Sequence, residues 1–182
     1  MHEHGSEELP PAPWHVPMSV GDIPETGERF ALVADAEVRA AVARLAGLRD
    51  LPRLQADFDV RRHGGGGLHV TGKVSATVGQ TCVVTLEPLT NEVDEDVDLL
   101  FLAPAVKRNG EKTDTGDEGW DEPEPLIDGR IDLGALATEF LVLGLDPYPR
   151  KPGAVFHPPQ DSTADEGPFA ALGALKKGSD GR

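Results

Sequence analysis

The sequence predicts an α+β fold in which an antiparallel β-sheet meander is covered by two helices. Apolar and polar residues alternate in successive stretches between residues 54 and 102, as in strands with one buried face. The connections between these stretches are short, whereas parallel strands need a crossover of a dozen or more residues. Two amphipathic segments, at residues 35–47 and 132–144, lie before and after the sheet. The pattern leaves open whether the sheet is flat, curled or barrel-like.

The N-terminal part of the chain is expected to supply an arm, short strands and the first helix. Residues 1–13 are polar and aperiodic, which predicts a disordered arm. Short apolar runs at residues 14–20 and 28–33 indicate one or two entering strands. Asp35 is typical of a helix N-cap, and Gly47 of the left-handed residue that follows a helix. The apolar residues with helical spacing in this segment are Val38, Ala41, Val42, Leu45 and Leu48.

The sheet is expected to contain four successive strands. Residues 54–61 and 68–78 alternate between apolar and polar side chains, and the four glycines within residues 63–67 predict the turn of a long hairpin. Residues 82–86 are predicted to form a third strand and residues 92–102 a fourth. Short connections make all these pairings antiparallel.

The C-terminal half combines polar segments with one helix. Residues 104–125 are rich in Gly, Pro, Asp and Glu, which predicts a mobile acidic loop. Asp132 is expected to cap the second helix, whose wide apolar stripe would cover the buried face of the sheet. Residues 14–145 are therefore expected to form a single α+β domain. The prolines that follow predict an extended tail over residues 146–182, with a short amphipathic segment at 169–177.

Length and composition narrow the class of protein. The chain has 182 residues and a single cysteine, which excludes an intramolecular disulfide and a zinc centre built from several thiolates. No apolar run approaches the roughly 20 residues needed to span a bilayer. The N-terminus lacks the basic and apolar regions of a signal peptide. We therefore expect a cytoplasmic protein, monomeric, with no membrane partner and no small-molecule substrate.

Charge is distributed unevenly along the chain. The net charge is −15, which argues against a conventional nucleic-acid binder. Residues 29–73 hold eight basic and five acidic side chains, whereas residues 85–139 hold sixteen acidic and four basic ones. The acidic segment has two interpretations: it keeps a loop solvated, or it attracts a basic protein.

Catalytic and metal-binding patterns are weak. Cys82 has no Cys-His signature around it, and on a strand face shared with Val84 and Leu86 it is expected to be a small core residue. The histidines are too scattered along the chain for a convincing metal site. We therefore expect no cofactor, no metal and no enzymatic activity.

One basic cluster offers a different function. Arg61, Arg62, His63, His69 and Lys73 surround the predicted hairpin turn and could contact RNA phosphate. The competing interpretation is a solvated hairpin end.

The segment Gly79-Gln80-Thr81-Cys82-Val83-Val84-Thr85-Leu86-Glu87-Pro88-Leu89, followed by the acidic stretch of residues 93–97, resembles the hallmark of the YceD family, the large ribosomal RNA subunit accumulation proteins. Later segments, at residues 127–143 and 168–176, are similar to the family's acidic turn, helix and C-terminal motif. The resemblance covers residues 14–177.

This resemblance implies a non-enzymatic bacterial factor needed for accumulation of 23S rRNA, with a ribosomal protein, the large-subunit precursor or rRNA as partner. Many relatives carry a second cysteine where this chain has Thr85, and residues 144–160 contain no cysteine, so a zinc role does not transfer. The candidate binding residues, from the family motifs and the charged surfaces, are Cys82, Thr85, Leu86, Glu87, Pro88, Asp94, Glu95, Asp96, Arg61, Arg62, Lys73, Phe169, Leu172 and Lys176.

Overall fold

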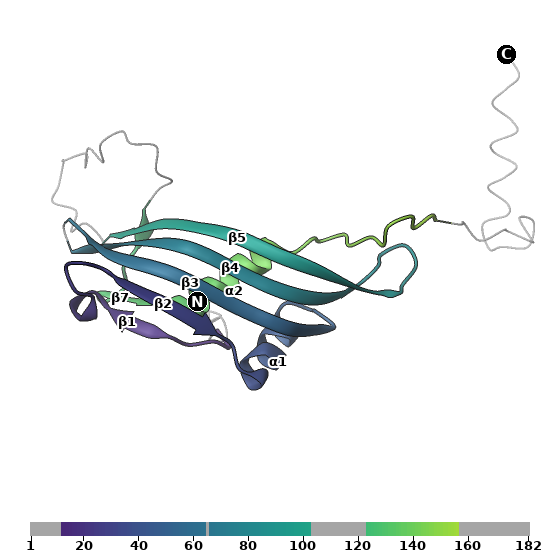
Figure 1. Cartoon of the computed structure of the whole chain (residues 1–182), viewed down its shortest axis with the longest axis horizontal. Coiled ribbons are helices and arrows are strands. Elements are labelled where there is room, and N and C mark those ends of the chain that lie inside the picture. The colour runs from purple at the N-terminus through teal and green to yellow at the C-terminus, as the bar shows by residue number, and fades with distance from the viewer. Residues whose placement is uncertain (1–11, 65, 103–122, 157–182) are drawn as a thin grey trace, which may run out of the picture.

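A computed structural model describes residues 12–64, 66–102 and 123–156 (Figure 1). Most of the expected arm and acidic loop, and the whole amphipathic segment 169–177, lie outside these residues. The main sheet contains β2 (Glu28–Val33), β3 (Asp50–His63), β4 (Gly67–Thr81), β5 (Pro88–Leu102) and β6 (Glu124–Pro125), in that spatial order. The other elements are β1 (Pro17–Ser19), which pairs with β7 (Arg130–Asp132), the 3-10 helix η1 (Val20–Asp22), α1 (Ala36–Leu45) and α2 (Leu133–Leu143).

The α+β class and the antiparallel meander of β2 to β5 are confirmed. The described strands form an open, twisted sheet and do not close into a barrel (Figure 1). One pairing departs from the prediction: β6 runs parallel to β5, and its two residues lie inside the segment predicted to be a loop. Residues 103–123 are long enough for the crossover that a parallel pair requires.

The prediction of a separate strand at residues 82–86 is wrong, because these residues form the turn between β4 and β5. The backbone N–H of Cys82 donates to the carbonyl of Glu87 at 2.9 Å, and that of Leu86 donates to the carbonyl of Cys82 at 3.0 Å. The strand β4 instead continues through Gly79, where a Cβ would lie 2.4 Å from Oδ1 of Asp50. The glycine thus marks a close approach between β3 and β4 and not a turn.

The core lies on one face of the sheet, where Phe58, Val70 and Val74 are fully buried. The helix α2 crosses this face and packs against β4 and β5 (Figure 1). Its N-cap is Asp132, as predicted, whose carboxylate accepts the N–H groups of Gly134 and Ala135 at 3.0 Å each. No helix among the described residues is both long and apolar enough to cross a membrane.

The helix α1 lies at the end of the sheet where β3 begins, and it buries Val42 and Ala43. Its N-cap is Asp35, whose carboxylate accepts the N–H of Val38 at 2.8 Å, as the sequence predicts. The Gly47 that follows the helix has a φ of +65°, the left-handed conformation expected of it. Among the described elements, the helices thus occupy one face and one end of the sheet, and the opposite face stays polar.

Candidate functional site

A line of four carboxylates runs along the polar face of β5. Glu92, Asp94, Asp96 and Asp98 are exposed, whereas Val93 and Val97 between them are buried. The two-residue period of a strand sends these two sets of side chains to opposite faces. We call these four residues the acidic row. The predicted site residues Asp94 and Asp96 belong to it.

Glu95 belongs to the other face of β5. It is half-buried there, at the C-terminal end of α2, where a Cβ on Gly144 would lie 2.5 Å from its Oε1. The structure therefore separates Glu95 from Asp94 and Asp96, its neighbours in the predicted site.

Cations and a histidine from the neighbouring strands pair with three members of the acidic row. Arg53 of β3 contacts Glu92 at 2.8 Å. From β4, Lys73 contacts Asp96 at 3.1 Å and His69 contacts Asp98 at 2.7 Å. The ladder register explains these contacts, because Lys73 lies opposite Asp96, and His69 lies two residues from Thr71, the partner of Asp98, on the same face of β4.

The arginine pairing has an electrostatic consequence for Glu92. The hydrogen bond from Arg53, reinforced by one from the Thr77 hydroxyl at 3.0 Å, lowers the pKa of the Glu92 carboxyl below its usual value. Within the described residues, Asp94 has no ion-pair or hydrogen-bond partner, because Ser75 lies opposite it.

The acidic row remains accessible despite these pairs. The side chains of Glu92, Asp96 and Asp98 are 57%, 85% and 63% exposed. Exposed pairs of this kind contribute only about 0 to 1 kcal/mol each to stability. Cations of a binding partner can therefore replace the intramolecular ones at a small cost in free energy. The row is thus a negatively charged track whose carboxylates can accept hydrogen bonds from Lys or Arg of another molecule.

The family-like segment forms a tight turn at the end of β4, the cysteine turn (residues 82–87). Cys82 is fully buried, as predicted, but its neighbours differ from the prediction, because Leu86 is 76% exposed. Leu86 also adopts a φ of +60°, which is uncommon for a branched side chain. The strand face expected to group these residues does not exist, because the chain reverses there.

The Cys82 sulfur lies in a pocket of backbone donors. The N–H groups of Thr85 and Lys151 both donate to Sγ at 3.4 Å. These bonds lower the pKa of Cys82 to about 6, and the bond from Lys151 has the largest effect, followed by those from Thr85. The turn therefore stabilises a thiolate. A nucleophilic role also needs access and a neighbouring base, whereas this buried thiol contacts backbone amides and the Thr85 side chain.

A second segment, which we call the strap (residues 145–151), holds the cysteine turn in place. The N–H of Val83 donates to the carbonyl of Pro149 at 2.9 Å, and Lys151 Nζ contacts Glu87 at 2.9 Å. The hydrogen bond from Lys151 lowers the pKa of the Glu87 carboxyl. The Gln80 amide also donates to the carbonyl of Asp146 at 2.9 Å. The role of Lys151 could not be predicted from the sequence, since isolated contacts between distant segments leave no periodic signal.

The basic residues expected at the hairpin tip do not form one cluster. Arg61 pairs with Asp59 on the polar face, and the bond to Arg61 lowers the pKa of that carboxyl. Arg62 points to the other side and donates to the backbone carbonyls of Ile23 and Gly21 at 2.5 and 3.1 Å. Lys73 lies in the middle of β4, paired with the acidic row. Each of these three cations thus has an intramolecular partner.

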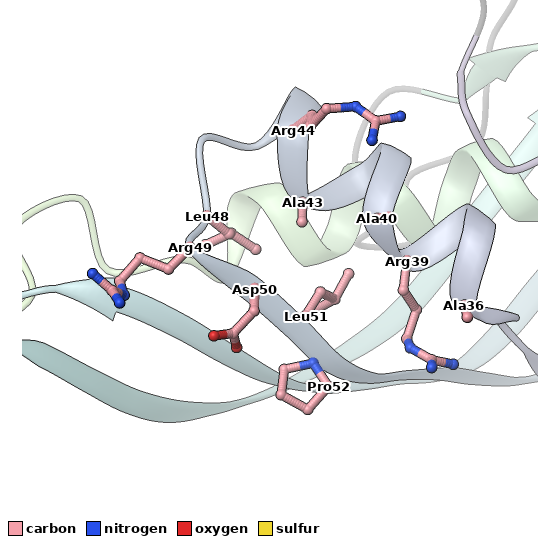
Figure 2. Close-up of a pocket in the computed structure, with 10 residues that line it drawn as sticks. All are labelled: Ala36, Arg39, Ala40, Ala43, Arg44, Leu48, Arg49, Asp50, Leu51 and Pro52. Carbon is pink, nitrogen blue, oxygen red and sulfur yellow. The ribbon is translucent and has the colours of Figure 1, made fainter.

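The hollow beside α1 provides no better site. An open hollow of about 360 Å³ lies between α1 and the start of β3, and Arg39, Arg44 and Arg49 are on its rim. Figure 2 shows the three guanidinium groups pointing in different directions, so they do not converge on a ligand.

Across the described part of the chain, no group of three or more His, Cys, Asp or Glu residues could hold a metal ion. The remaining candidates, Phe169, Leu172 and Lys176, lie outside the described residues.

Comparison with known proteins gives one match. Residues 70–176 match the family model described as "Large ribosomal RNA subunit accumulation protein YceD". The match begins within β4, a shorter span than the expected 14–177, and contains the cysteine turn, the acidic row and the strap. No curated protein and no solved structure matches the chain.

Proposed function

The chain belongs to the YceD family of large ribosomal RNA subunit accumulation proteins, and on this premise we propose that it is a non-enzymatic accessory factor of large-subunit biogenesis. In this proposal it supports 23S rRNA accumulation in the cytoplasm by binding a basic ribosomal protein or a precursor particle. The family assignment gives a role connected with ribosome biogenesis. The proposal adds the kind of partner and the surface that binds it.

The acidic row is the observation that carries this proposal. It presents four exposed carboxylates on one strand face, and Arg53 and Lys73 are the permanently charged side chains paired with it among the described residues. Such a track raises the association rate of a basic partner at low ionic strength. It repels RNA phosphate, which favours a protein partner over direct RNA contact.

The expected absence of catalysis is supported by the surroundings of Cys82. The thiol is fully buried, and its sulfur accepts hydrogen bonds from two backbone N–H groups. This arrangement fits a structural role in which the cysteine joins the turn to the strap.

The alternative function, RNA binding through Arg61, Arg62 and Lys73, has weaker support. The three side chains face different directions and are engaged within the chain. Arg61 and Arg62 also lie before the segment that matches the family model.

A pull-down with matched variants tests the proposal. In one variant the acidic row is neutralised by Glu92→Gln, Asp94→Asn, Asp96→Asn and Asp98→Asn. The control neutralises four exposed carboxylates elsewhere, at Glu25, Glu28, Glu37 and Glu139, with the same change in net charge. We expect the unmodified chain and the control to retain large-subunit proteins at low salt and release them as salt rises, and the row variant to retain none.

Two results would count against the proposal. Equal retention by the row variant and the control would remove the acidic row from the interaction. The alternative would be favoured if the chain retained RNA, and if this binding were lost only on charge reversal of Arg61 and Arg62.

A further inference from the structure

Among the described residues, the edge of the main sheet at β5 is open over most of its length. The strand β6 pairs only with Phe101 and Leu102, and within the described residues no strand pairs with Pro88 to Leu100 on that side (Figure 1). At about 3.3 Å per residue this edge is roughly 40 Å long. The β4–β5 register continues without a bulge from Pro88 to Phe101, so the edge is regular. Long regular edges are templates for another strand, and natural proteins usually blunt them.

The acidic row also supplies the free backbone groups of this edge. The carbonyl of Leu102 accepts the N–H of Leu126, which lies outside β4, so Leu102 faces away from β4. At the other end of the strand, Pro88 lies opposite Thr81 and has no N–H to donate to β4. Antiparallel residues alternate between those that bond the partner strand and those that face away from it. The even-numbered residues of β5 therefore direct their N–H and C=O groups toward the open side. These residues include all four members of the acidic row.

The charges on this edge select what can pair with it. A second copy of the chain, added edge to edge, would set one acidic row against another, and like charges directly opposite each other are destabilising. A strand with Lys or Arg at alternate positions would place each cation beside a carboxylate of the acidic row. Its intervening side chains would lie beside Val93 and Val97, on the apolar face, so small β-branched residues fit there.

We propose that the open edge of β5 binds an extended basic segment of the partner protein by strand addition, with its cations alternating with apolar side chains. This inference rests on the proposed function and specifies how the partner binds. Backbone hydrogen bonds would provide the pairing, and the acidic row would provide the selection for a basic sequence.

Hydrogen exchange of the full chain, followed residue by residue with NMR, tests the proposal. The probe is a short peptide in which lysine alternates with valine, and its control is the same peptide methylated at the lysine backbone nitrogens. The control keeps every charge but cannot form the ladder. We expect the probe to slow exchange at Glu92, Asp94, Asp96 and Asp98 by at least about tenfold. Val93 and Val97, already bonded to β4, should change little, and the methylated peptide should protect none of them.

A pair of variants at one position separates strand addition from attraction by charge alone. Asp94→Asn removes the charge and keeps the edge N–H, whereas Asp94→Pro removes both; an edge proline leaves the bonds to β4 intact. We expect Asp94→Pro to weaken peptide binding at least about tenfold more than Asp94→Asn does, since it also interrupts the ladder. If Asp94→Pro fails to fold, the exchange pattern of the unmodified chain decides.

Several results would overturn strand addition. One is that the methylated peptide binds as tightly as the probe, and another is that the probe protects odd-numbered and even-numbered residues equally. The third such result is that the even-numbered amides are already protected in the free chain, by its own segments or by a second copy. If the chain retains large-subunit proteins without alternating protection, the proposed function stands and this binding mode fails. If the peptide protects the edge but no ribosomal component is retained, the binding mode stands and the proposed function fails.

Discussion

The two faces of the main sheet use the same strands for different purposes. On one face Val93 and Val97 of β5 are 5% and 2% exposed and pack in the core, whereas Asp94 and Asp96 on the other face are exposed. Burial of apolar area stabilises the fold, and exposed carboxylates contribute little to it. The acidic row therefore contributes little to folding, so its charge can be altered without losing the structure that presents it.

The largest expected effect is on the buried face, at Phe58. This side chain is fully buried at the centre of the sheet, and Phe58→Ala should lower the free energy of unfolding by about 3 to 5 kcal/mol, through lost burial and a cavity. Urea denaturation measures the change. A loss below about 1 kcal/mol would show that this face is not the core.

A smaller effect is expected where the buried face meets α2. A Cβ on Gly144 would lie 2.5 Å from Oε1 of Glu95 and 2.7 Å from the buried Val93 side chain. Gly144→Ala should therefore destabilise the fold by about 1 to 3 kcal/mol, because Val93 cannot move away freely.

The control for this change is Gly64→Ala, since a Cβ there would meet nothing within 4 Å. Thermal unfolding of the two variants measures the difference. Equal stability of both variants would contradict the close approach at Gly144.

A pH-dependent effect is expected at Cys82, which belongs to neither face. Its pKa is lowered to about 6 from an ordinary value of 9.0, so the folded state releases this proton more readily than the unfolded state. The stabilising contribution is fully present above pH 9 and is lost as the pH falls through about 6. Cys82→Ser should therefore reduce the rise in stability between pH 6 and pH 9.

Two measurements check this prediction. Unfolding midpoints of the parent chain and Cys82→Ser, compared across the pH range, give the stability difference. Ultraviolet absorbance of the thiolate reports the titration itself, because the chain has one cysteine. A thiolate that forms only near pH 9 would contradict the role of the Lys151 and Thr85 amides.

The smallest effect is expected on the exposed face, at Asp94. Since this carboxylate has no partner within the described residues, Asp94→Asn should change the free energy of unfolding by no more than about 0.5 kcal/mol in either direction. Urea denaturation of Asp94→Asn and Phe58→Ala, measured side by side, compares the two changes in the free energy of unfolding. A loss comparable to that of the core variant would mean that the exposed face contributes to stability as much as the buried face does.

Much of this comparison could be predicted from the sequence. Two-residue alternation predicted β3, β4 and β5, and the caps Asp35 and Asp132 predicted both helices, because these signals are local and periodic. The turn at residues 82–87 was missed because the predicted second strand ended at residue 78, whereas β4 continues through Gly79, where the constraint is the neighbouring Asp50. That constraint comes from a residue distant in the sequence.

The candidate site was predicted less completely. Charge and the family-like acidic stretch of residues 93–97 predicted Asp94 and Asp96 as site residues but grouped them with Glu95, which the strand period places on the other face. It placed Lys73 with the hairpin tip, whereas the ladder register pairs it with Asp96. The contacts of the strap and the open edge of β5 depend on which segments meet in space, and a periodic pattern does not specify them.

Complementation of cells that lack their own copy of this protein tests whether the acidic row is needed for function. The chain with the acidic row neutralised at Glu92, Asp94, Asp96 and Asp98 is compared with the control neutralised at Glu25, Glu28, Glu37 and Glu139, at equal protein levels. The quantity measured is 23S rRNA. We expect a normal amount of 23S rRNA with the control and a deficit with the row variant. Full restoration by the row variant would exclude a role for the acidic row in 23S rRNA accumulation.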